Sequence, residues 1–144
     1  MTGELSIPCN KNNLKVVRSF LQNELITIFN TEDLNLVILC IDEICANIII
    51  HEQDKTLNKN LQVSYNLNLD RQTITFTIKH QGNSFNYDSY KEPHLNSLIS
   101  EKKKGGIGLL LVTRIMDSIK CEQLSKYCIT TLSKKINRLD PITS

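Results

Sequence analysis

The chain has 144 residues, of which 40% are hydrophobic and 22% charged, and its formal net charge at pH 7 is +2. This length suffices for one domain with a hydrophobic core, and so small a charge gives no electrostatic reason to expect nucleic-acid binding. The sequence has no apolar run long enough to span a membrane and no N-terminal pattern typical of a secretory signal. We therefore expect a single cytoplasmic domain over residues 1–144.

The cysteines are odd in number and contain no C-x-x-C pair. We therefore expect the cysteines to behave as small hydrophobic residues in a reducing compartment, and not to form a disulfide framework or a zinc site. The five residues concerned are Cys9, Cys40, Cys45, Cys121 and Cys128.

The first part of the chain predicts a strand followed by two helices. Residues 4–9 alternate in polarity, as a short strand does. Apolar residues then recur with the helical period over residues 14–28, which predicts a first helix. Asn30 is a suitable residue to start a second helix. The helical pattern of this second segment fades near residues 51–54, where we expect the helix to end.

The rest of the chain predicts two pairs of strands with a helix between them. The segments are 61–69 and 73–78 for the first pair, 107–117 for the helix, and 119–123 and 127–134 for the second pair. Residues 83–104 have no regular pattern, and such a long irregular stretch in a compact domain is typical of a lid. The order predicts an α+β fold, a two-layer α/β sandwich whose mixed, mostly antiparallel sheet is covered on one face by helices.

Glu43 and Asn47 lie four residues apart in the otherwise almost wholly apolar run of residues 36–50. Their i, i+4 spacing places them on one face of the predicted helix. A buried carboxylate is costly unless it is paired or neutralised, so the pair calls for an explanation. One interpretation is a general base with a magnesium-binding amide. The other is a structural carboxylate that pairs with backbone or with a basic group near a subunit interface.

A lysine- and glycine-rich turn, KKKGGIG over residues 102–108, precedes the third predicted helix. Glycine allows close backbone approach, and the N–H groups at a helix N-terminus attract anions. The spacing matches neither the Walker loop nor the dinucleotide fingerprint. The turn therefore indicates either a phosphate site or a flexible loop with solvated lysines.

Together these segments resemble the histidine kinase-like ATPase superfamily (the Bergerat fold), and within it the anti-sigma-factor serine/threonine-protein kinases, over roughly residues 5–136. Residues 41–51 (IDEICANIIIH) are similar to the N box. The resemblance implies a general base at Glu43 and a magnesium-binding Asn47. Residues 104–117 (KGGIGLLLVTRIMD) are similar to the G2 box, whose glycines wrap the nucleotide phosphates. The phosphate-binding residues that it implies are Lys104, Gly105, Gly106 and Gly108.

The third family motif, the G1 box, departs from the pattern at one position. The family ends this strand with Asp-x-Gly, and the aspartate accepts a hydrogen bond from the adenine amino group. Residues 78–85 read IKHQGNSF here, so Gly82 fits while His80 replaces the aspartate. A neutral imidazole accepts one hydrogen bond without the assistance of a charge. Losing a charged partner costs about 1–3 kcal/mol, so adenine recognition is expected to be weakened at His80.

The resemblance implies a regulatory serine kinase that uses ATP and Mg²⁺. Its substrate would be a small anti-sigma-factor antagonist, and the chain would alternate between that antagonist and a sigma factor, as a homodimer. Direct contact with nucleic acid or membrane is not expected. The alternative is a non-catalytic Bergerat-fold protein-binding module with weakened or lost ATP binding. A detached ATPase domain of a sensor kinase is less favoured, because no dimerisation or phosphoacceptor helix is evident.

Overall fold

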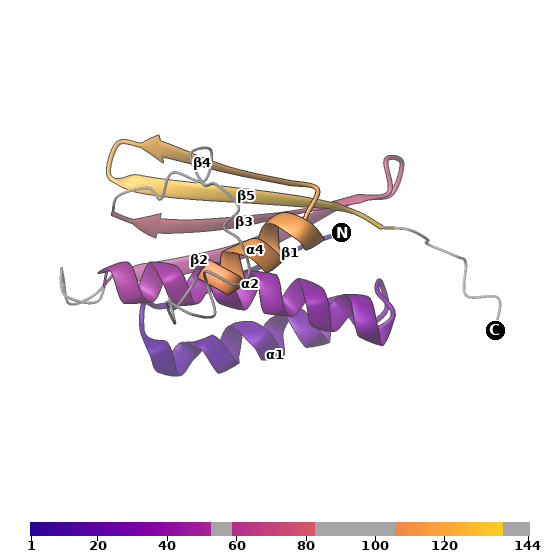
Figure 1. The fold of residues 1–144 in the computed structure, drawn as a ribbon, viewed down its shortest axis with the longest axis horizontal. Helices are drawn as coiled ribbons and strands as arrows, with labels where there is room; N and C mark the ends of the chain where they lie inside the picture. The colour runs from indigo at the N-terminus through magenta and orange to yellow at the C-terminus, as the bar shows by residue number, and fades with distance from the viewer. Residues whose placement is uncertain (53–58, 83–105, 137–144) are drawn as a thin grey trace.

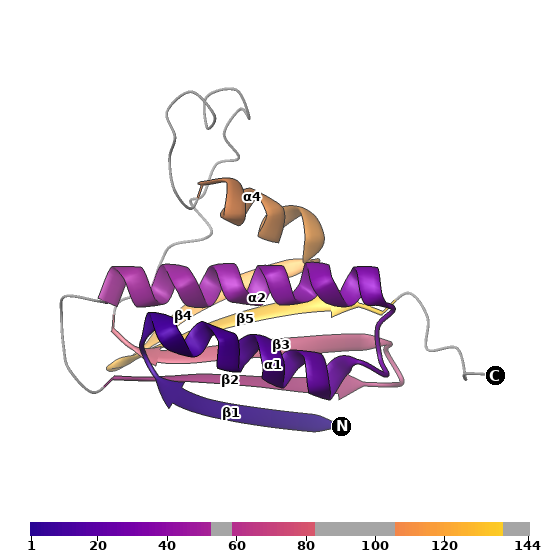
Figure 2. The same ribbon diagram turned by 90° about the horizontal axis from the view of Figure 1, so that it is seen from below.

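The computed structural model describes residues 1–52, 59–82 and 106–136, which form a sheet with helices on one of its faces (Figures 1 and 2). In chain order the elements are β1 (Thr2–Pro8), the 3₁₀ turn η1 (Lys11–Asn13), α1 (Leu14–Leu25), α2 (Thr31–Glu52), β2 (Asn60–Asn68), β3 (Thr73–Gln81), α4 (Gly106–Ile115), β4 (Ser118–Leu124) and β5 (Tyr127–Lys135). The lid predicted over residues 83–104 lies outside the described residues.

The five strands are ordered β1-β2-β3-β5-β4, and the four pairings between the described strands are all antiparallel. Alternate residues of each central strand are buried, as the sequence pattern predicts. Phe76 of β3, for example, lies opposite Tyr65 of β2 and Leu132 of β5, and all three side chains are buried. The predicted two-layer α+β fold is therefore confirmed.

Helix α2 occupies the middle of the helical layer, between α1 and α4 (Figure 2). It contributes fully buried side chains to the core, among them Val37, Ile41 and Ile44. This burial on several sides explains why its sequence is apolar almost all round. In the part of the chain that the structure describes, no helix has both the length and the apolarity that crossing a membrane requires.

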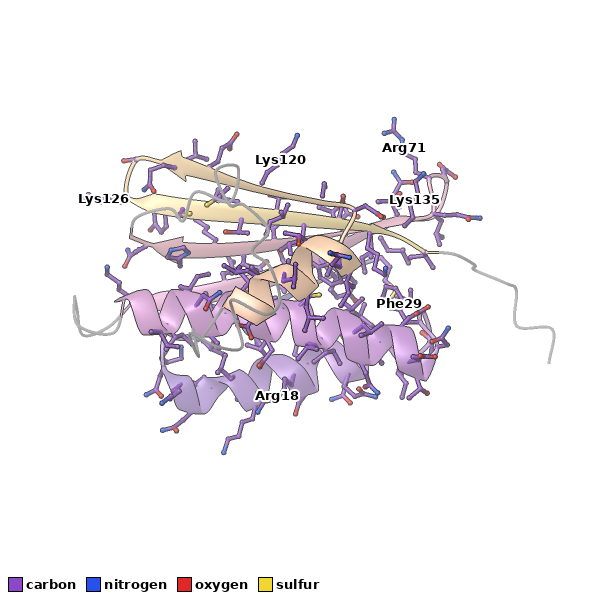
Figure 3. All side chains as sticks on the ribbon, viewed as in Figure 1. Arg18, Phe29, Arg71, Lys120, Lys126 and Lys135 are labelled. Carbon is purple, nitrogen blue, oxygen red and sulfur yellow. The ribbon has the colours of Figure 1, made fainter. Side chains whose placement is uncertain are left out.

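The start of α2 is set by a side-chain cap. Asn30 Oδ1 accepts a hydrogen bond from the Asp33 N–H at 2.8 Å, and its amide group donates to the Asp33 carboxylate at 3.1 Å. The first helix was predicted to continue to residue 28, but α1 ends at Leu25. The N–H groups of Ile28 and Phe29 both bond to the Leu25 carbonyl, which turns the chain while both side chains stay buried (Phe29 is labelled in Figure 3). The apolar period thus continues past the end of the helix.

The end of α4 also differs from the prediction. The helix was expected to reach Asp117, yet it ends at Ile115. Lys134 of β5 donates from Nζ to the Ile115 carbonyl at 3.1 Å, which satisfies a carbonyl at the helix C-terminus. The Asp117 carboxylate accepts a hydrogen bond from the N–H of Lys135 at 2.6 Å. Contacts with β5, distant in sequence, therefore determine this boundary.

Two isoleucines of α2 provide a matched test of the core. Ile41 is fully buried, whereas Ile50 is 58% exposed. We expect Ile41→Ala to lower the free energy of unfolding by about 2–5 kcal/mol, because it removes buried methyl groups and leaves a cavity. Ile50→Ala should change it by only about 0.5 kcal/mol. Urea unfolding followed by circular dichroism measures both, and equal losses would contradict the burial of Ile41.

Candidate functional site

Three segments that carry predicted site residues meet at one end of the molecule. The C-terminal ends of α2 and β3 and the N-terminal end of α4 all lie on the left in Figure 1. Helix α2 carries Glu43 and Asn47, β3 carries His80, and the first turn of α4 carries Gly108. Residues from distant parts of the sequence are thus grouped on the helical side of the sheet.

Within this group, Glu43 and Gly108 are in direct contact. The Glu43 side chain lies so close to the backbone of Gly108 that a β-carbon at position 108 would overlap its carboxyl carbon and Oε1. A glycine at this position leaves space for the Glu43 carboxyl group where α2 packs against α4, and any larger residue would displace that group. The contact places the carboxyl group at the first turn of α4, where helix N–H groups have no intrahelical partner.

Burial changes the acidity of this carboxyl group. The pKa of Glu43 is raised above its ordinary value, first by desolvation and second by the negative charge of neighbouring Asp42. Asp42 itself has a different contact, because its Oδ1 accepts a hydrogen bond from Arg18 Nη1 of α1 at 2.7 Å (Arg18 is labelled in Figure 3). Asp42 therefore joins α1 to α2, while Glu43 faces α4 with a raised pKa, as is typical of groups that exchange protons in catalysis.

Asn47 follows Glu43 by one helical turn and is also half-buried. The spacing puts its amide on the same face of α2 as the Glu43 carboxyl group. Carboxylate and amide oxygens are hard ligands of the kind that Mg²⁺ prefers, and Mg²⁺ needs only one or two such groups from a protein. The donor set on this face therefore fits a magnesium ion.

His80 lies near the end of β3 and is only 5% exposed. The alternation of β3 places it on the same face as Phe76 and Ile78, which is the face that the helices cover. Its neighbours across the sheet are Leu61 of β2 and Cys128 of β5. The structure thus directs His80 toward the helical layer, where Glu43 and Asn47 also lie.

Gly82 follows β3 and connects it to the β4–β5 hairpin. Its φ of 132° is readily adopted only by glycine. The Gly82 N–H donates to the Lys126 carbonyl at 3.0 Å, and the Gly82 carbonyl accepts from Gln123 Nε2 at 2.9 Å. A shallow pocket at this point is lined by Lys59, Gln81, Gly82, Gln123, Ser125 and Lys126.

The hairpin residues Gln123 and Lys126 are not among the predicted site residues. The two strands 119–123 and 127–134 predict a tight turn between them, but no signal in the sequence connects this turn to Gly82. Lys104 and Gly105, predicted to bind phosphate, lie outside the described residues, whereas Gly106 is the first residue of α4.

The sequence is similar to a family of known proteins and to two serine-protein kinases. The family model of the histidine kinase-like ATPase domain matches residues 7–134. Serine-protein kinase RsbW of Halalkalibacterium halodurans is 28% identical over an alignment of 129 residues that covers 85% of this chain and 76% of the relative. RsbW of Bacillus velezensis is 23% identical over an alignment of 139 residues that covers 93% of this chain and 85% of the relative.

A solved structure shows the same fold. One chain in the crystal structure of the SiaB–SiaC complex from Pseudomonas aeruginosa superposes with a TM-score of 0.57. The match covers 90% of this chain and 88% of that chain, at 16% sequence identity. Since the family model also matches nearly the whole sequence, the chain belongs to the family of histidine kinase-like ATPase domains.

Proposed function

We propose that this chain is an anti-sigma-factor-type regulatory serine kinase that binds Mg-ATP and phosphorylates a small anti-sigma-factor antagonist. The observation that carries the proposal is the Glu43 carboxyl group, half-buried and held against Gly108 at the first turn of α4. The similarity to two serine-protein kinases over most of the chain supports it.

In this proposal one residue of α2 accepts the proton of the substrate hydroxyl, and another binds the magnesium ion. Glu43 accepts the proton of the substrate serine hydroxyl, and its raised pKa brings it closer to the pH at which a general base is effective. Asn47 binds Mg²⁺ through its amide oxygen. Bound Mg-ATP supplies the transferable phosphoryl group and a metal ion that neutralises its charge.

The glycine-rich turn binds the phosphates in the same proposal. The backbone N–H groups at the start of α4 attract the phosphate oxygens, and Gly108 keeps a side chain out of the space beside Glu43. Lys104, Gly105 and Gly106 complete this turn in the sequence and add a positive charge next to the phosphates.

His80 and Gly82 border the adenine base in this proposal. His80 offers an uncharged acceptor where the family has a carboxylate, so the affinity for ATP is expected to be lower than in relatives with the aspartate. The chain works in the cytoplasm as a homodimer and alternates between the antagonist and a sigma factor. This last part rests on the resemblance of residues 41–51 and 104–117 to the anti-sigma-factor kinases.

His80 also favours a second candidate, a non-catalytic binding module with the same fold. In that case partner binding does not depend on ATP and is unaffected by Asn47→Ala. A large loss of partner binding in a folded Asn47→Ala variant would favour the kinase instead.

Nucleotide titration by calorimetry tests the role of His80. We expect His80→Asp to tighten Mg-ATP binding by about tenfold to a hundredfold, because it restores a charged acceptor for the adenine amino group. His80→Asn is the matched control: it is a similarly small side chain without charge, and it should not tighten binding. GTP, which lacks this amino group, should bind no better to His80→Asp. Absence of Mg-ATP binding by the wild type and by His80→Asp at millimolar nucleotide would contradict the kinase proposal.

Because Glu43 contacts Gly108, we expect a methyl group added at position 108 to lower the rate of phosphorylation. Gly108→Ala forces the Glu43 carboxyl group to move, and displacing a catalytic group by about 1 Å can cost about 100-fold in rate. Stability should change little, because alanine favours helix by about 1 kcal/mol over glycine and offsets the displacement. Phosphorylation of the antagonist in single-turnover assays measures the rate. Thr113→Ala, exposed on the same helix, should keep full activity, and equal activity of Gly108→Ala would argue against a role for the contact.

The raised pKa of Glu43 predicts a pH-dependent stability. Because ionisation is disfavoured only in the folded state, this group stabilises the fold fully below the ordinary glutamate pKa. That contribution is lost as the pH rises through the raised pKa. Glu43→Gln should therefore be more stable than the wild type at neutral pH, and the difference should vanish in acid. Thermal unfolding across this pH range measures it, with exposed Glu32→Gln as a control that should show no such gain.

A further inference from the structure

Two cysteines near the edge of the sheet are in direct contact. The Sγ atoms of Cys121 in β4 and Cys128 in β5 lie 2.8 Å apart. All five cysteines lie in the described part of the chain, and none of them is part of a disulfide there. A disulfide bond measures about 2.0 Å, so the two sulfur atoms need to approach by only about 0.8 Å to form one.

The strand register explains this contact. Cys121 pairs with Thr130 and Cys128 pairs with Gln123, so the cysteines are diagonal neighbours on one face of the hairpin. The Thr130 hydroxyl donates to Cys121 Sγ at 3.7 Å and orients that sulfur. Cys121 is half-buried on the outermost strand, whereas Cys128 is fully buried. A small oxidant therefore reaches Cys121 first, and Cys128 is positioned to react with the product.

The two cysteines of α2 differ from this pair. Cys40 and Cys45 are fully buried, and burial raises the pKa of the Cys40 thiol to about 12. Such a thiol is almost never ionised at neutral pH and is chemically inert. The prediction that Cys40 and Cys45 are packing residues is consistent with this burial, while the hairpin pair has a geometry that packing does not require.

We propose that Cys121 and Cys128 form a reversible thiol–disulfide site that responds to hydroperoxides. The Cys121 thiolate attacks the peroxide, the O–O bond breaks, and Cys121 becomes a sulfenic acid while one water is released from hydrogen peroxide. The Cys128 thiol, already in contact with Cys121 Sγ, then gives up its proton and attacks the sulfenic sulfur, the S–S bond forms, and the sulfenic oxygen leaves as a second water. Two electrons pass from the two thiols to the peroxide, and exchange with a thiol reductant reverses the reaction.

The position of the pair gives the disulfide a structural effect. Cys128 lies opposite His80, and Lys126, at the tip of the same hairpin, holds Gly82 through its carbonyl (Figure 3). A disulfide bond between β4 and β5 restricts the motion of this hairpin. Because the hairpin is hydrogen-bonded to Gly82, the bond also restricts the end of β3. The two cysteines react within the hairpin itself, so this site does not depend on the proposed kinase activity.

Peptide mapping tests the site directly. The full chain is treated with hydrogen peroxide, alkylated under denaturing conditions and digested with trypsin. Cleavage after Lys120 and Lys126 separates the cysteines into peptides 121–126 and 127–134, so a disulfide leaves these two peptides joined until a reductant is added. We expect the joined pair to be the main oxidation product. Recovery of both peptides in singly alkylated or separately oxidised form would overturn the proposal.

Variants of the cysteines complete the test. Cys121→Ser should abolish the joined peptides, and Cys128→Ala serves if the serine variant folds poorly. Cys9→Ser, a half-buried cysteine outside the hairpin, should leave them unchanged. Hydrogen exchange of the Gly82 N–H and of the β4–β5 amides should slow on oxidation in the wild type and not in Cys121→Ser. Joined peptides that involve Cys9 in equal yield, or exchange unaffected by oxidation, would contradict a specific site coupled to β3.

Discussion

The contact between Glu43 and Gly108 sets where the Glu43 carboxyl group lies at the site, between α2 and α4. Helix α2 is anchored in the core by buried residues such as Ile41 and Ile44, so the position of Glu43 is set by the packing of the whole domain. Because position 108 has no β-carbon, this carboxyl group lies directly against the backbone of α4. The carboxyl group and the first turn of α4 are thereby brought together, and the proposed chemistry depends on their proximity.

This arrangement has an electrostatic cost. Asp42 and Glu43 are adjacent carboxylates, and their charges disfavour each other. The fold separates their roles: Asp42 forms an ion pair with Arg18 between α1 and α2, and Glu43 is directed to α4, where burial raises its pKa. A residue that disfavours folding at neutral pH is consistent with a functional rather than a structural role.

The sequence predicted the two layers of the fold, because these depend on local patterns. The period of apolar residues locates the three described α-helices and the five strands, and the i, i+4 spacing of Glu43 and Asn47 places them on one face of α2. The ends of α1 and α4 were predicted wrongly because hydrogen bonds outside the helical pattern set them, at Ile28 in a turn and through Lys134 from β5.

Other features depend on contacts between distant segments. The proximity of Glu43 to Gly108 requires the relative position of two helices, and no pattern within either one reveals it. The Cys121–Cys128 contact requires the register of β4 with β5, because a shift of one residue would place the two sulfur atoms on opposite faces. The role of Gly82 in binding the hairpin likewise follows only from the arrangement of β3 beside β5.

The most direct test of the central claim is the magnesium dependence of ATP binding in the wild type and in Asn47→Ala. If the Glu43–Asn47 face of α2 holds the metal beside the phosphates, Mg²⁺ should strengthen ATP binding to the wild type. Asn47→Ala should retain ATP binding in the absence of metal and lose the strengthening by Mg²⁺. Calorimetric titrations with and without Mg²⁺ measure both quantities. An equal effect of Mg²⁺ on the two proteins would contradict a magnesium nucleotide site on this face of α2.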